Sequence, residues 1–91
     1  MRLPSIVTSV LSVAVTLAAA PAFAATCQEL WVERNQIYKN HGYCFKTQRA
    51  IAYFGNAGCT VRNENALRLG AGDQNRIAQI LRQERAQRCP K

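Results

Sequence analysis

The first 24 residues constrain this chain most, because they form an apolar leader in front of a short domain that holds every cysteine. Arg2 is the leader's only charge, residues 6–20 are apolar or small, and small residues at Ala22 and Ala24 suit a signal peptidase. A membrane-spanning helix needs about 20 apolar residues, whereas this run is shorter and is interrupted by Ser and Thr. We therefore expect residues 1–24 to be an export signal cleaved after Ala24, which leaves residues 25–91 as one periplasmic or secreted domain.

The four cysteines, Cys27, Cys44, Cys59 and Cys89, all follow the leader. An even number of cysteines in a short exported chain favours disulfides, and a domain this small needs such cross-links for stability. Four cysteines allow three pairings. We favour Cys27–Cys89, which joins the two ends of the domain, together with Cys44–Cys59, which closes a short loop. A zinc site is disfavoured because the chain has no C-x-x-C pair, so we expect no metal and no cofactor.

The first helical pattern covers residues 26–41. Thr26 and Glu29 form a capping box that starts the helix, and Gly42 can take the positive φ that ends it. One stripe at helical spacing is mostly apolar and is expected to supply most of the core: Leu30, Trp31, Arg34, Ile37, Tyr38 and His41.

Two further helices are expected. The second starts at Thr47 and ends near Phe54, with Ile51 and Phe54 on one side. The third starts at Gly70 or Asp73 and continues to about Arg88; its core stripe is Ile77, Ile80, Leu81 and Glu84. Residues 59–72 have no clear period, and we expect an ordered loop fixed by Cys59 and by apolar side chains. The predicted fold class is all-α, a small three-helix domain cross-linked by two disulfides.

A motif at the end of the first helix resembles that of a known family. Tyr38-x-x-His41-Gly42, with Leu30-Trp31 and Arg34-Asn35 before it and aromatic residues after it, is similar to the YARHG domain family. Lys39 and Asn40 replace the Ala and Arg of the namesake Tyr-Ala-Arg-His-Gly motif. The resemblance spans most of residues 25–91 and weakens after Cys59. It implies a helical, extracytoplasmic module, often attached to other envelope proteins, with no established catalytic activity.

Arg34 is a candidate binding residue, because a charge on a core-facing stripe needs a partner. One hypothesis is that it fastens the third helix or the loop, through backbone carbonyls, Glu64 or Glu84. The other is that it stacks on Trp31 and binds an anionic ligand there.

Arg82 and Arg85 are the other candidates. They lie on the third helix with Arg88, either as a solvated end that complements the helix dipole or as a basic patch for envelope polyanions or lipid headgroups. For His41 we expect a role in ending the first helix, since no carboxylate partner can be placed beside it from sequence.

The remaining patterns exclude several function classes. Residues 25–91 contain no serine, no phosphate-binding loop and no nucleophile motif, so we expect no enzyme. The net charge of +7 favours anionic partners, but the basic residues lack the interleaved aromatics of a nucleic-acid site. The leading hypothesis is an exported module that binds an envelope polymer or another extracytoplasmic protein. The alternatives are a cationic membrane-active polypeptide or an enzyme inhibitor that uses the loop at residues 60–72.

Overall fold

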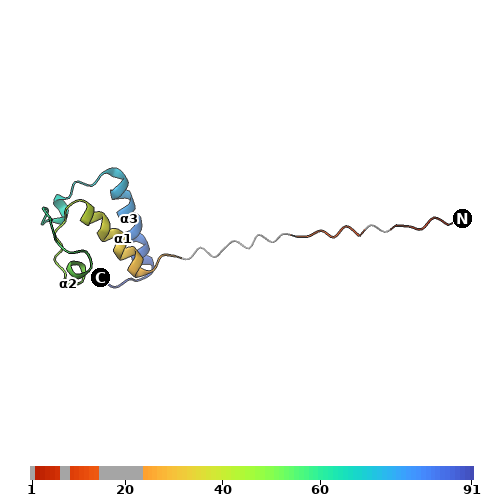
Figure 1. Ribbon diagram of the computed structural model, residues 1–91, viewed down its shortest axis with the longest axis horizontal. Coiled ribbons are helices and arrows are strands. Elements are labelled where there is room, and N and C mark those ends of the chain that lie inside the picture. Colours follow the sequence, from red (N-terminus) through yellow and green to blue (C-terminus); the bar gives the residue numbers. More distant parts are fainter. Residues whose placement is uncertain (1, 7–8, 15–23) are drawn as a thin grey trace.

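The computed structural model describes residues 2–6, 9–14 and 24–91 (Figure 1). The elements, in chain order, are α1 (Cys27–Asn40), α2 (Gln48–Phe54), a short 3₁₀ helix η1 (Glu64–Ala66) and α3 (Ala71–Ala86). Within the described residues there is no β-sheet, only an isolated parallel bridge between Tyr43 and Val61. The predicted all-α class with three principal helices is therefore confirmed.

The predicted leader is only partly described. Residues 2–6 and 9–14 have no regular secondary structure. Ala22 and Phe23, which belong to the expected cleavage motif, lie outside the described residues. Among the helices of the described part, none has both the length and the apolar character needed to cross a membrane.

Two disulfides cross-link the domain, and both have the pairing that we favoured. Cys27–Cys89 joins the first turn of α1 to the segment after α3, with the two Cα atoms 5.4 Å apart. Cys44–Cys59 joins the segment after α1 to the loop before η1, with a Cα separation of 5.1 Å. The first bond fixes where α3 ends relative to α1, and the second ties the segment before α2 to the loop after it.

Local sequence signals set both ends of α1. The Thr26 hydroxyl accepts a hydrogen bond from the Glu29 backbone N–H at 3.1 Å, and the Glu29 carboxylate accepts one from the Thr26 backbone N–H at 3.4 Å. This is the predicted capping box. Gly42 follows the helix at φ +83°, where a Cβ atom would lie 2.9 Å from the Thr60 hydroxyl oxygen. Glycine is therefore required here both by backbone conformation and by the close approach of the loop.

The third helix begins as expected and ends slightly before the expected end near Arg88. Its N-cap is Gly70, with no side-chain cap, and Asp73 lies inside the first turn. At the other end, the helix stops at Ala86 and Arg88 takes the left-handed conformation, φ 54°. The Cys89 N–H donates to the Glu84 carbonyl and the Arg88 N–H to the Arg85 carbonyl. This pair of hydrogen bonds is a Schellman motif with arginine in the place that glycine usually takes.

The core lies where α1 meets the other two helices. Leu30 and Ile80 are fully buried, and a cluster of Tyr38, Phe45, Ala50 and Ile77 is nearly so. α1 packs against both α2 and α3, and in Figure 1 it lies between them. Leu67 and Leu69 pack against the core, so the unpatterned loop is held by apolar contacts as expected.

Four side chains depart from the predicted core. Ala50, not Ile51, is the buried residue of α2, and Ile51 is 41% exposed. Leu81 is also exposed at the surface of α3. In α1, Asn35 is buried because its side-chain amide donates to the Trp31 carbonyl at 2.8 Å, which satisfies the polar group inside the helix.

Candidate functional site

The candidate Arg34 is held by an internal partner. Its Nε donates to Glu84 Oε1 at 2.7 Å and its Nη2 to Glu84 Oε2 at 3.2 Å. The two side chains are only 20% and 13% exposed. Burial lowers the pKa of Arg34, but the hydrogen bond and the charge of Glu84, with smaller contributions from Tyr38, together outweigh burial, and the net shift is upward. Arg34 therefore fastens α1 to α3 through Glu84, one of the partners that the structural interpretation predicted.

The candidate Trp31 lies among aromatic rings and carries a cation that the sequence did not suggest. Its ring centroid is 5.6 Å from that of Tyr53, in a T-shaped arrangement, and 5.6 Å from that of Phe54. The guanidinium of Arg49, on α2, lies 3.8 Å from the centre of the Trp31 ring. The cation above Trp31 is thus Arg49, and its role is to hold α2 on α1.

The two candidates on α3, Arg82 and Arg85, differ in their surroundings. Arg82 and Arg85 are both exposed. Arg85 lines a surface depression of about 590 Å³ at the C-terminal end of the chain, which also includes Arg34, Leu81, Glu84, Arg88 and Lys91. Arg82 is not among its lining residues. The structure therefore brings Arg34 and Arg85 to one basic depression, whereas Trp31 and Arg82 do not line it.

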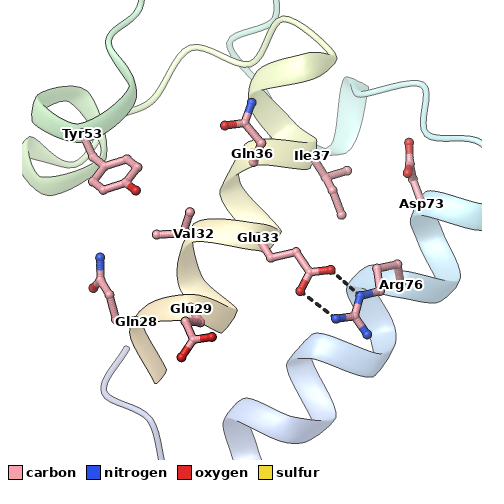
Figure 2. Close-up of a pocket in the computed structure, with 9 residues that line it drawn as sticks. All are labelled: Gln28, Glu29, Val32, Glu33, Gln36, Ile37, Tyr53, Asp73 and Arg76. Atoms are coloured by element: carbon pink, nitrogen blue, oxygen red, sulfur yellow. Dashed lines mark hydrogen bonds and ion pairs between the residues drawn. The ribbon is translucent and has the colours of Figure 1, made fainter. Parts of the chain in front are cut away.

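A larger depression, about 660 Å³, lies on the outer face of α1 between α2 and α3 (Figure 2). We call it the α1 groove. It is formed by two adjacent i, i+4 rows of α1, with Tyr53 of α2 on one side and α3 on the other. The apolar lining residues are Val32, Ile37 and Tyr53, and the polar ones are Gln28, Glu29, Glu33, Gln36, Asp73 and Arg76.

The carboxylates give the α1 groove an acidic rim. Three carboxylates and one arginine line it, a formal balance of −2 on a chain whose net charge is +7. Arg76 donates from Nε and Nη2 to the two oxygens of Glu33, each at 2.6 Å, as the dashed lines in Figure 2 show. The hydrogen bond to Arg76 lowers the pKa of Glu33, so this carboxylate is ionised at neutral pH.

Asp73, at the upper end of the rim, contacts His41, for which no carboxylate partner was expected. The His41 Nε2 lies 2.8 Å from Asp73 Oδ2, so His41 has the carboxylate partner that could not be placed from sequence. The two residues are 32 positions apart and meet only because α1 and α3 are antiparallel. His41 also forms the C-cap of α1, as expected, so this contact connects the end of α1 to the start of α3.

The α1 groove was not predicted from the sequence. The expected core stripe of α1 includes Ile37 but not Val32, which received no role. A single β-branched residue in a polar row, between Gln28 and Gln36 at i, i+4 spacing, was the available signal. Tyr53, which is 57% exposed, lines the α1 groove only because α2 packs beside α1, and the sequence does not show that packing.

The α1 groove is suited to binding. It combines aliphatic and aromatic surface with carboxylates and amides at the rim, the pattern of a site that holds an apolar group and orients its polar neighbours. Among the described residues, no three His, Cys, Asp or Glu side chains are grouped so that they could hold a metal ion.

The fold and the α1 groove define a small disulfide-linked helical domain with an open groove on its surface. The family model of the YARHG domain matches residues 7–85, which is most of the chain, and the protein therefore belongs to the YARHG domain family. The match begins inside the predicted leader and ends before Cys89. No curated protein and no solved structure matches the chain.

Proposed function

We propose that this protein is an exported, non-enzymatic module that binds another extracytoplasmic protein through the α1 groove. Membership of the YARHG family and the two disulfides, which form in oxidising compartments, support the location. The observation that supports the binding role is the α1 groove itself. It is a depression of about 660 Å³ whose exposed surface is mainly apolar, and no other part of the described chain covers it. Its volume is typical of ligand-binding sites.

The α1 groove is a better candidate than the basic depression at the end of α3. In the depression, Arg34 and Glu84 neutralise each other at close range, and Leu81 is the one large apolar side chain of the lining. Charged rims contribute association rate and specificity more than affinity, whereas buried apolar anchors contribute affinity. Val32, Ile37 and Tyr53 offer such an anchor site.

Export with cleavage after Ala24 is part of the proposal. Ala25 already belongs to the domain, because its carbonyl accepts a hydrogen bond from the Gln87 side chain at 2.8 Å. Cleavage after Ala24 would therefore remove the leader and leave this contact intact. Intact mass of the protein isolated from the cell envelope or culture fluid, with and without reductant, tests the proposal. We expect a chain starting at Ala25 whose mass rises by four hydrogens on reduction; an uncleaved chain with free thiols would contradict it.

Site-specific photo-crosslinking in living cells tests the binding role. A photoreactive phenylalanine analogue replaces Gln36, an exposed residue of the α1 groove, and in a matched control it replaces Gln83, an exposed residue of α3 outside it. We expect a discrete adduct of constant mass from position 36 and none from position 83. Equal labelling at both positions, or no adduct at position 36, would contradict the proposal.

A further inference from the structure

We infer that the segment that binds in the α1 groove carries an apolar anchor residue flanked by lysine or arginine. This inference rests on the proposed function and adds the chemistry of the partner. The site and the charge of its rim argue against the simpler expectation that a protein with a net charge of +7 uses its basic surface to bind an anion.

The anchor follows from the apolar part of the groove. Tyr53 is 57% exposed, and in Figure 2 its ring lies on the α2 side of the α1 groove with the hydroxyl end directed towards Val32. Exposed tyrosines on a rigid helix are frequent centres of binding energy, because they bury a large area at small entropic cost. Ile37 extends the same apolar surface towards α3. A single leucine- or phenylalanine-sized side chain would fit against Val32 and Tyr53, which lie on the same side of α1 in Figure 2.

The cationic flanks follow from the rim. Glu33 and Asp73 have side chains that are 43% and 45% exposed, and each uses only part of its acceptor capacity on its internal partner. A carboxylate accepts several hydrogen bonds, so Lys or Arg of a partner can bind beside Arg76 or His41 without displacing either. Glu29 adds a third negative charge at the opposite end of the α1 groove.

The rest of the surface sharpens this preference. Arg85, Arg88 and Lys91 line the basic depression, so an acidic segment would be drawn to the end of α3. The same residues make a second copy of this chain a competing occupant, since Leu81 with its basic neighbours has the chemistry that the α1 groove would select. That contact would join two different surfaces head to tail, so that each copy could bind a further copy in an open assembly. The inference commits to a different protein, and self-association is an outcome that overturns it.

Peptide selection on the exported, disulfide-bonded protein tests the inference. Short random peptides displayed on phage are selected on the immobilised protein. The selected peptides are then tested for binding to the wild type and to a Tyr53→Ala variant. We expect a consensus with one large apolar residue flanked by Lys or Arg, no binding to Tyr53→Ala, and normal binding to a variant with Arg85→Ala and Arg88→Ala. An acidic consensus, a consensus that needs Arg85 and Arg88, or no enrichment would overturn the inference.

Two substitutions at one ion pair give a test that a structural role cannot imitate. With a selected peptide as the probe, Glu33→Gln removes a negative charge from the rim, and Arg76→Gln removes the positive one. We expect Glu33→Gln to weaken binding about threefold and Arg76→Gln to strengthen it about threefold, the size of exposed charge interactions. Arg82→Gln, an exposed arginine outside the α1 groove, is the control and should weaken or strengthen binding by much less. Changes of the same sign in both variants would overturn the inference.

The outcomes separate the two proposals. An adduct at position 36 whose cross-linked partner segment is acidic would leave the proposed function standing and overturn the inference. Absence of the adduct would overturn the proposed function whatever the peptides show. A mass in light scattering that rises with protein concentration in the wild type, but not in Tyr53→Ala, would assign the α1 groove to a second copy and overturn the inference.

Discussion

Two arginine–glutamate pairs join α1 to α3, and the environments around them differ. Arg34–Glu84 has side chains 20% and 13% exposed and closes one side of the interface between the helices. Arg76–Glu33 has nearly the same paired geometry, but its side chains are 38% and 43% exposed on the rim of the α1 groove. The comparison teaches that exposure, rather than contact geometry, separates a charge pair that stabilises the fold from one that can also meet a partner.

The difference arises from adjacent positions on one helix. Glu33 and Arg34 are neighbours in sequence, so their side chains point about 100° apart around α1. Arg34 thereby faces the side on which Tyr38 and Glu84 are partly desolvated, and Glu33 faces the open α1 groove.

The largest expected effect comes from the disulfide that holds both pairs in register. Replacing Cys27 and Cys89 by alanine releases a long loop, and on the chain-entropy model this lowers the free energy of unfolding by about 4 kcal/mol. Replacing Cys44 and Cys59 should cost about 3 kcal/mol, because that loop is shorter. Urea unfolding checks both; a larger loss for the Cys44–Cys59 variant would contradict the assignment of the main cross-link to the ends of α1 and α3.

The next effect distinguishes the two ion pairs directly. Glu84→Gln leaves the half-buried Arg34 guanidinium without its charge partner and should lower the free energy of unfolding by about 2 kcal/mol. Glu33→Gln is the matched control, and we expect no measurable change in its thermal midpoint because its pair is solvated. Equal losses in the two variants would remove the distinction on which the comparison rests.

A smaller effect concerns the end of α3, one turn beyond Glu84. Arg88 is held in the left-handed conformation, φ 54°, which glycine adopts without the steric cost of a Cβ atom. Arg88→Gly should therefore raise the free energy of unfolding by about 1 kcal/mol, as measured by urea unfolding. Arg85→Gly, within α3 where φ is helical, should instead destabilise the protein. A destabilised Arg88→Gly variant would show that the arginine side chain contributes more than its backbone costs.

Tyr38 reports on the desolvated side of α1. Burial, followed by a hydrogen bond to Glu64, raises the pKa of Tyr38 from 10.0 to about 12. The folded state holds this proton more tightly than the unfolded state, so the contribution to stability is complete below pH 10 and declines as pH rises towards 12. An absorbance titration of tyrosinate should show one late-titrating group that disappears in Tyr38→Phe. If the group that is missing from Tyr38→Phe titrates early in the wild type, the side of α1 that holds Arg34 is not desolvated.

Much of the fold was predictable from local signals. The capping box at Thr26 and Gly42 after α1 follow from short-range chemistry, and both are confirmed. The disulfide pairing was favoured among three alternatives, and it is also confirmed. The partners of charged residues were harder, because they depend on how α1 and α3 align. Glu84 was one of several partners considered for Arg34, and Asp73 was not recognised as the partner of His41.

The candidate site was the least predictable part. Isolated apolar side chains on a mainly polar helix face line a groove only when two other helices flank that face, and no sequence period records that arrangement. The net positive charge directed attention to Arg82 and Arg85, whereas the acidic rim is assembled from residues on α1 and α3 that are distant in sequence.

One paired measurement tests the central claim that the α1 groove, and not the charge pair inside the fold, is the surface that meets a partner. The thermal midpoint and the yield of the position-36 adduct are determined for Glu33→Gln and for Glu84→Gln, at a temperature where both variants are folded. The account predicts that Glu33→Gln keeps its thermal midpoint and gives less adduct than the wild type, while Glu84→Gln has a lower thermal midpoint and an unchanged yield of adduct. Adduct yield that follows the thermal midpoint in both variants would contradict it.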